Sequence, residues 1–198
     1  MVSFAAIDFE TATSSRDSAC AIGIAIVDDG EITVKRSWLI KPPGNDYDDF
    51  NITIHGITPK DTKRQPSFDR VWPDVHEYVG DRVVLAHNAQ FDISVARASA
   101  NYHEFQLPKL RFACTLGMAR TIWPNRPRHT LNSLAQDFGI PLNHHDAESD
   151  ASAAAELGLM MCKRNETSGI EELVAGMKYR LGYLDGDNYR GFSNKGLG

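Results

Sequence analysis

Residues 19–40 read ACAIGIAIVDDGEITVKRSWLI, and this stretch predicts two antiparallel strands. The apolar run at residues 19–27 has the length and the branched side chains of a buried strand. Asp-Asp-Gly at residues 28–30 is typical of a tight hairpin turn. The partial alternation over residues 31–40 then predicts the returning strand. With the apolar strand at residues 3–8, the fold therefore opens with an antiparallel meander.

Further along the chain, apolar periodicity predicts helices that alternate with strands. A loop is expected at residues 41–50, where Pro, Gly, Asn and Asp gather. The later strands are expected at residues 82–86 and 110–114, and the helices at residues 67–79, 88–102, 115–123, 130–138 and 147–163. Strands followed by alternating helices and strands predict an α/β fold, with a mixed sheet flanked by helices.

The sequence changes in character at residue 169. One last helix is expected at residues 169–177, and the polar chain beyond it shows no periodicity and is punctuated by Gly182, Gly186, Gly191, Gly196 and Gly198. We therefore expect a folded domain over residues 1–168. Residues 169–198 are expected to add a C-terminal helix and a glycine-rich tail that is either mobile or docked only on a partner.

Composition restricts the class of protein. The chain has 198 residues, 42% of them hydrophobic and 24% charged, which is the ordinary globular range. It contains no apolar run of the roughly 18 residues that a membrane helix needs, and its N-terminus lacks a signal-peptide pattern. Its three cysteines are far apart, which disfavours a disulfide framework or a zinc site. We expect a cytoplasmic protein with no membrane partner.

The charge distribution leaves two interpretations open. The net charge of -5 has the opposite sign to that of most nucleic-acid binders. Residues 97–129, however, carry six basic side chains and one acidic side chain. Such a segment can form a surface that follows phosphates, or it can be an ordinary solvated surface of helices and loops.

Asp8 and Glu10 lie at the end of the first predicted strand. Both side chains leave the same face, because strand residues alternate between the two faces of a sheet. Two carboxylates at the end of an apolar strand repel each other and lose hydration, and a divalent cation offsets both costs. An isolated Asp-x-Glu is also common where a strand continues into a solvated turn. This pair alone therefore does not distinguish a cation site from such a turn.

Residues 87–92, HNAQFD, follow one predicted strand and open a helix. Functional groups of α/β proteins gather at such boundaries. Asp92 lies in the first helical turn, where a carboxylate also complements the helix dipole. Taken by itself, Asp92 can be either a functional group or a carboxylate that only complements the helix dipole.

Residues 145–150, HDAESD, open the alanine-rich helix. Asp146 is the predicted N-cap of this helix. Helical side chains tilt back toward the N-terminus, so His145 and Asp150 can point toward one place. The alternatives are a surface histidine and an exposed helical aspartate. We expect His144 to be a solvated neighbour.

Taken together, these motifs resemble the 3′–5′ exonucleases of the DNA polymerase III epsilon-subunit type. This group is the branch of the DEDD superfamily whose third motif carries a histidine. Further similar stretches are HGIT at residues 55–58, CTLGMAR at 114–120, and WP at 123–124 followed by LNSL at 131–134. The resemblance extends from residue 3 to residue 162 and implies a ribonuclease H-like fold for the exonuclease domain at residues 1–168.

The resemblance also implies functional residues. It assigns the metal ligands, for two ions of Mg²⁺ or Mn²⁺, to Asp8, Glu10, Asp92 and Asp150. It assigns the general base to His145. The substrate-binding residues implied around the 3′-terminal nucleotide are Thr11, Ala12, His55, Asn88 and Phe91.

The chemistry of these groups leads to one main hypothesis. Two divalent ions activate a water molecule and stabilise the leaving oxygen of a phosphodiester. We therefore expect an enzyme that releases nucleoside 5′-monophosphates from the 3′ end of single-stranded or frayed DNA. The expected partners are nucleic-acid 3′ ends and a DNA polymerase subunit.

Three alternatives remain at this stage. The same site would serve an exoribonuclease of the oligoribonuclease or tRNA-trimming kind, since no residue reads the 2′ hydroxyl unambiguously. A non-catalytic polymerase accessory protein would keep the fold and need not bind metal. In the third alternative, the carboxylates are only surface charges of an α/β domain.

Overall fold

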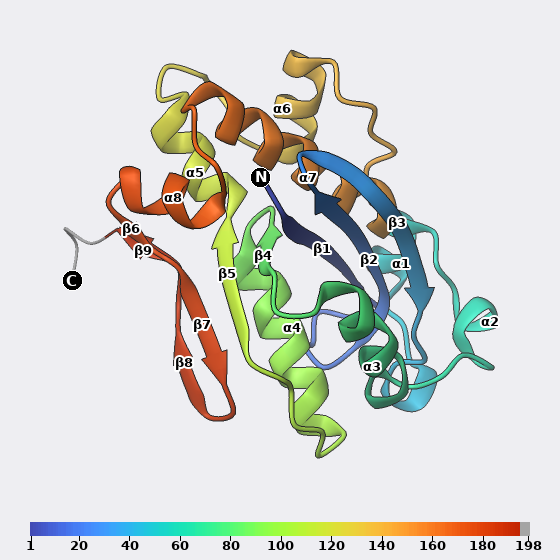
Figure 1. The fold of residues 1–198 in the computed structure, drawn as a ribbon. Coiled ribbons are helices and arrows are strands. Elements are labelled where there is room, and N and C mark those ends of the chain that lie inside the picture. Colours follow the sequence, from blue (N-terminus) through green and yellow to red (C-terminus); the bar gives the residue numbers. More distant parts are fainter. Residues whose placement is uncertain (195–198) are drawn as a thin grey trace.

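Seven strands form one mixed sheet in the computed structural model, which describes residues 1–194 (Figure 1). In spatial order they are β3 (Glu31–Leu39), β2 (Ala19–Asp28), β1 (Phe4–Thr11), β4 (Val83–Ala86), β5 (Leu110–Cys114), β7 (Gly182–Asp185) and β8 (Asn188–Arg190). β1, β4 and β5 run parallel, and the other neighbouring strands are antiparallel. The expected α/β class, with a meander followed by parallel strands, is confirmed.

The hairpin between β2 and β3 is the predicted tight turn. Asp28 pairs with Glu31 across it. The two central residues, Asp29 and Gly30, have φ angles of 54° and 87°. Positive φ at both positions is what a two-residue turn needs to match the twist of the strands.

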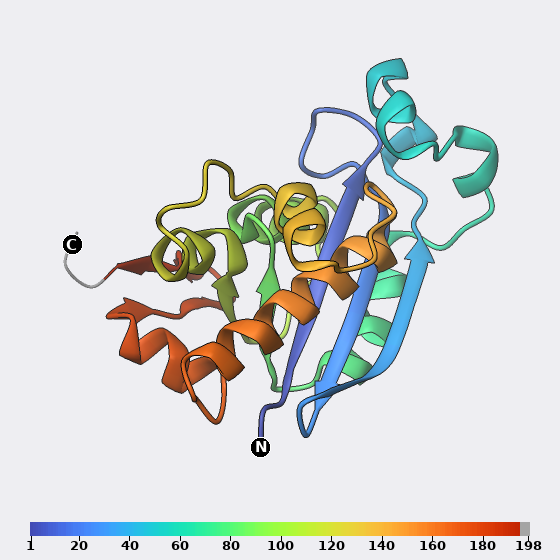
Figure 2. The same cartoon turned by 90° about the horizontal axis from the view of Figure 1, so that it is seen from above.

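Helices cover both faces of the sheet (Figure 2). They are α1 (Asp49–His55), α2 (Pro59–Thr62), α3 (Phe68–Val79), α4 (Ala89–Tyr102), α5 (Thr115–Ile122), α6 (Leu131–Phe138), α7 (Ala147–Arg164) and α8 (Ile170–Gly176), with a short 3-10 turn η1 (Pro43–Asn45). α3 and α4 pack on one face, and α5, α6, α7 and α8 pack on the other. None of the helices in the described residues is long and apolar enough to cross a lipid bilayer.

The alternation along β1 decides where its carboxylates point. Ile7 and Phe9 belong to the core with α3 and α4. Phe4 and Ala6 belong to the core with α7. Asp8 and Glu10 continue the second series, so their side chains leave the sheet on the face that α7 covers. The site is therefore built between the end of β1 and the start of α7.

Two segments differ from the sequence-based expectation. The chain expected to be a loop at residues 41–50 contains η1 and the first residues of α1. The glycine-rich segment, expected to be a tail that is mobile or docked only on a partner, instead forms β7 and β8, and a two-stranded sheet of β6 (Tyr179–Arg180) and β9 (Ser193–Asn194). β7 gains its stability from pairing with β5, a long-range contact that local periodicity does not reveal. Residues 195–198, with Gly196 and Gly198, lie outside the described residues. The domain boundary at residue 168 stays a prediction.

The start of α7 is held close to the sheet by a glycine of β2. A Cβ atom at Gly23 would lie 2.0 Å from the carbonyl oxygen of Ala147, which is the first residue of α7. Such a distance cannot exist in a folded protein, so only glycine lets the helix approach this closely. Gly23 thereby fixes the position of the helix turn that carries Asp150.

We predict that Gly23→Ala lowers the free energy of unfolding by about 1–3 kcal/mol, because the added methyl group must push α7 away from β2. Gly176→Ala is the matched control, since a Cβ there meets no atom within 4 Å. The control should be neutral, or stabilising by up to about 1 kcal/mol. Urea unfolding measures both variants. A Gly23→Ala protein as stable as the wild type would contradict this account of the α7 position.

Candidate active site

A cavity of about 660 Å³ opens at the end of β1. Its lining comes from segments that are far apart in the sequence: β1, α1, the start of α4, the region from α5 to α6, and the start of α7. The carboxyl ends of β1, β4 and β5 lie at this edge of the sheet, where α/β proteins usually place their ligands. The motifs that sequence analysis singled out therefore converge here.

Three of the expected metal ligands form one group. Carboxylate oxygens of Asp8, Glu10 and Asp150 all lie within 4.8 Å of one another. The side chains of Glu10 and Asp150 are buried, with 11% and 5% of their surface exposed. This is a compact set of hard oxygen donors, of the kind that Mg²⁺ and Mn²⁺ prefer.

Asp92 borders this group from α4. Its Oδ1 atom accepts a hydrogen bond of 3.1 Å from the backbone N–H of Phe9 in β1. Its Oδ2 atom is buried and has no hydrogen-bond partner within the part of the chain that the structure describes. An unsatisfied buried oxygen is costly, and a cation is one partner that would satisfy it. Asp92 is thus placed to complete the donor set, although it is not within the 4.8 Å group.

Burial raises the pKa of all four carboxyl groups, and the charges of neighbouring carboxylates raise the pKa of Asp8, Glu10 and Asp92 further. Burial, then the charges of Asp92, Asp150 and Glu10, raise the pKa of Asp8 well above its ordinary value. Burial, then Asp150 and Asp92, raise the pKa of Glu10 to about 8. Burial raises the pKa of Asp92 to about 7, and the pKa of Asp150 is also raised by burial. The site therefore holds protons at neutral pH that a bound cation would displace.

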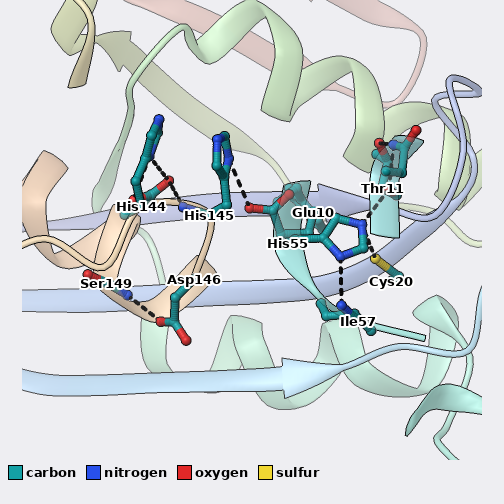
Figure 3. A network of polar contacts seen from close by, with 12 residues as sticks. Glu10, Thr11, Cys20, His55, Ile57, His144, His145, Asp146 and Ser149 are labelled. Carbon is teal, nitrogen blue, oxygen red and sulfur yellow. Dashed lines mark hydrogen bonds and ion pairs between the residues drawn. The ribbon is translucent and has the colours of Figure 1, made fainter. Parts of the chain in front are cut away.

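His145 lies beside the carboxylates, in the loop just before α7 (Figure 3). Its Nδ1 atom is 4.0 Å from Oε1 of Glu10. Its backbone N–H donates a hydrogen bond of 3.2 Å to Oδ2 of Asp150. Burial, then the neighbouring His144, lower the pKa of His145. A lowered pKa favours the neutral imidazole, which is the form that can accept a proton at pH 7.

We expected His144 to be only a solvated neighbour, but it belongs to the site. Its Nδ1 atom lies 2.9 Å and 3.2 Å from the two carboxylate oxygens of Asp150. Its ring also stacks on the ring of His145, with the centroids 3.9 Å apart. The contact depends on the loop conformation, with His145 at a φ of 70°, which the sequence pattern does not reveal.

The expected substrate-binding residues divide into two groups. Thr11, His55, Asn88 and Phe91 line the cavity. His55 Nε2 lies 3.1 Å from the carbonyl oxygen of Thr11, and its Nδ1 atom accepts a hydrogen bond from the backbone of Ile57 (Figure 3). These contacts fix the ring against the end of β1.

Ala12 does not line the cavity. Its side chain is fully buried. Its backbone N–H donates to the carbonyl of Ser18, and its carbonyl accepts from the N–H of Asp48. Ala12 therefore contributes to the loop beside the cavity and presents no side chain to it.

Other cavity residues were not anticipated. Asn51, on α1, donates a hydrogen bond of 2.8 Å to the carbonyl of Thr11. Beside the cavity, the guanidinium of Arg16, which does not itself line it, lies over the ring of Phe91, 4.4 Å from its centroid. Arg120, in α5, and Arg128, in the segment before α6, add positive charge to the cavity lining. Composition alone indicated a basic segment here but did not locate these side chains relative to the carboxylates.

His87 supports the wall of the cavity. Its two ring nitrogens contact the hydroxyl of Thr115 and the carbonyl of His129, both at 2.9 Å. Burial lowers the pKa of His87 to about 4, so the ring is neutral at pH 7. This residue ties the end of β4 to the start of α5 and to the segment before α6.

Comparison with known proteins agrees with this geometry. The model of an exonuclease family, RNase_T, matches residues 5–157. The chain therefore belongs to this exonuclease family, and the resemblance to DEDD-superfamily 3′–5′ exonucleases is confirmed.

The curated relatives are much longer proteins. The PolC-type DNA polymerase III of Streptococcus pneumoniae (strain D39) is 32% identical over 152 residues, which are 75% of this chain and 10% of that protein. The PolC-type DNA polymerase III of Clostridium perfringens is 34% identical over 158 residues, which are 78% of this chain and 11% of that protein. This chain thus spans about a tenth of the length of these relatives.

Solved structures share the fold. Exonuclease X in complex with 5′-overhanging duplex DNA has a TM-score of 0.65 and 24% identity, over 88% of this chain and 98% of that one. The nuclease domain of 3′hExo, a DEDDh family member bound to rAMP, has a TM-score of 0.71 and 16% identity, over 82% and 92% of the two chains. The expected ribonuclease H-like fold is confirmed.

The raised acidities predict how the metal-free protein responds to pH. Glu10 ionises near 4.5 when exposed in the unfolded chain, and near 8 in the folded protein. Between these values the folded state keeps a proton that the unfolded state has lost. The free energy of unfolding should therefore fall as the pH rises from about 4.5 to about 8.

We predict that Glu10→Gln flattens this fall, because the buried ionisable group is gone. Glu77→Gln, at an exposed position of α3, is the matched control and should leave the pH dependence unchanged. Urea unfolding with a metal chelator present, repeated at a series of pH values, measures how the free energy of unfolding of each protein depends on pH. An equal slope in Glu10→Gln and the wild type would show that Glu10 is not the group that titrates.

Proposed function

We propose that this chain is a two-metal-dependent 3′–5′ exonuclease, which hydrolyses the last phosphodiester bond of single-stranded or frayed DNA and releases nucleoside 5′-monophosphates. The observation that supports the proposal most is the group of carboxylate oxygens from Asp8, Glu10 and Asp150, which lie within 4.8 Å of one another at a cavity. Membership of the exonuclease family supports the reaction class. The PolC relatives, which are DNA polymerases by name, support DNA as the substrate and a polymerase as a partner.

The four carboxylates fit a pair of divalent cations. Asp8, Glu10, Asp92 and Asp150 would hold Mg²⁺ or Mn²⁺, and the unpartnered buried Oδ2 atom of Asp92 supports this fit. Bound there, the two ions lower the pKa of a water molecule and stabilise the charge that develops on the leaving oxygen. With the ions in place, the carboxylates are anionic and the repulsion among them is relieved.

His145 would take the proton of the attacking water. Its neutral imidazole is suited to this role, and its pKa is lowered chiefly by burial. The backbone hydrogen bond from His145 to Asp150 keeps the base next to the metal ligands. His144, which contacts both oxygens of Asp150, would hold that carboxylate in its orientation.

The 3′-terminal nucleotide would enter the part of the cavity next to α1. Thr11, His55 and Phe91 surround it there, and Phe91 offers an aromatic surface for a base or sugar. Asn88 would contact the same nucleotide from the start of α4. An unpaired end reaches such a pocket more readily than a paired one, which supports single-stranded or frayed substrates.

An exoribonuclease is the alternative from the same class of enzyme. It is supported by the 3′hExo nuclease domain, a structure of this fold that was solved bound to rAMP. Parallel assays on 3′-labelled DNA and RNA of one sequence decide between the two. If nucleotides are released faster from RNA than from DNA, RNA replaces DNA as the proposed substrate.

We predict that His145→Ala binds Mn²⁺ like the wild type but hydrolyses DNA about 10²–10⁴-fold more slowly, because only the base is removed. Asp8→Asn should lose both metal binding and hydrolysis, since it removes a ligand. Asp74→Asn, at an exposed position of α3, is the matched control and should keep both.

Isothermal titration with Mn²⁺ and single-turnover release of nucleotide measure the two properties. Near-normal hydrolysis by His145→Ala would exclude its role as the base. A wild-type chain that binds no Mn²⁺ would favour the non-catalytic accessory protein.

A further inference from the structure

A second cavity, of about 600 Å³, lies beside the candidate active site. We call it the C-terminal cavity, because residues 179–194 form one of its sides. The starts of α4 and α5 and the end of β5 form the other side. Asn88, Leu116 and Arg120 line both cavities, so the two cavities adjoin at these residues. The segment that closes the C-terminal cavity lies outside residues 5–157, which the family model matches.

The C-terminal segment, residues 179–194, packs against α5. The rings of Tyr179 and Phe192 stack with centroids 4.9 Å apart. The hydroxyl of Tyr179 lies 3.1 Å from the hydroxyl of Thr121 in α5. A Cβ atom at Gly117 would lie 3.1 Å from the ring of Phe192, so the ring rests against the start of this helix. The wall of the cavity is therefore held in place by α5.

A third aromatic side chain comes from the edge strand β8. Tyr189 lines the C-terminal cavity, and 39% of its surface is exposed. Its ring stacks on that of Phe112, with centroids 6.2 Å apart and planes 14° apart. The guanidinium of Arg97 lies 4.4 Å from the centre of the same ring. Arg97 covers one face of the Tyr189 ring and Phe112 packs against it, so the ring is held in a fixed orientation at the rim of the cavity.

The lining favours an anionic ligand with flat rings. Among residues 1–194, the charged side chain of the lining is Arg120, the polar side chains include the amides of Asn88 and Gln90, and no carboxylate belongs to the lining. A different cavity, near the far end of α4, shows the contrast, because Glu104 and Asp187 line that one. Aromatic rings combined with arginine and amides are typical of surfaces that bind single-stranded nucleic acid.

We propose that the C-terminal cavity binds the nucleotides that precede the scissile bond. The inference rests on the proposed function and extends it. With the terminal nucleotide at Thr11 and His55, the rest of the strand passes Arg120, which lines both cavities. Arg120 then meets a backbone phosphate between the two cavities, and bases stack on the aromatic side chains of residues 179–192.

The test compares substrate lengths. The thymidine dinucleotide fills only the terminal pocket and the scissile position, whereas the thymidine octamer also reaches the C-terminal cavity. Tyr189→Ala should raise KM for the octamer several-fold, because it removes an aromatic side chain of the cavity lining and frees the Arg97 side chain from its place on that ring, and it should leave KM for the dinucleotide within twofold. Tyr102→Ala is the matched control, because Tyr102 is an exposed tyrosine of α4 that lines neither cavity.

A second variant tests the same cavity even if Tyr189→Ala disturbs the folding of β8. Ser193 is exposed and lines the C-terminal cavity, so Ser193→Asp adds a negative charge there with little structural cost. It should raise KM for the octamer several-fold at low salt, and the effect should shrink as salt is added. The dinucleotide should again be unaffected.

Two results would overturn the inference: no change of KM for the octamer in either variant, or equal rises for the octamer and the dinucleotide. A wild-type chain that hydrolyses neither substrate would instead overturn the proposed function. In that case the inference is tested separately, by measuring the binding of a 5′-labelled octamer with fluorescence anisotropy. Weaker binding by Tyr189→Ala and Ser193→Asp supports it, and unchanged binding overturns it.

Discussion

The repulsion among buried carboxylates is the constraint on which the site depends. Glu10, Asp92 and Asp150 are buried, and Asp8 lies among them. Each of the four has a raised pKa, so the metal-free fold keeps these groups together only by holding protons on them or by bearing unfavourable charge. Nothing in the packing of an α/β core requires such a cluster.

The scaffold brings the groups together from both faces of the sheet. Alternation along β1 sends Asp8 and Glu10 toward α7, while Asp92 reaches the same edge from α4 on the opposite face. Gly23 lets the start of α7 come close enough for Asp150 to join them. The arrangement of the site is therefore a consequence of strand register and helix packing. Helix α1, which ends at His55, and the loop that carries His145 add groups around this centre.

Much of this could be predicted from the sequence, because each motif lies at an element boundary that local patterns reveal. The spacing of Asp8 and Glu10 gives their common face, and the alanine-rich run gives α7. The contact of His144 with Asp150 depends on a loop conformation, with His145 at a φ of 70°, that periodicity does not encode. The strands near Tyr183 and Tyr189 were missed because they are short and depend on pairing with β5, far away in the sequence.

A crystal structure of the protein soaked with Mn²⁺ and a nucleoside 5′-monophosphate tests the central claim most directly. The account predicts two ions held by Asp8, Glu10, Asp92 and Asp150, with the nucleotide next to Thr11 and His55. Ions bound elsewhere, or carboxylates that share no common metal, would contradict it.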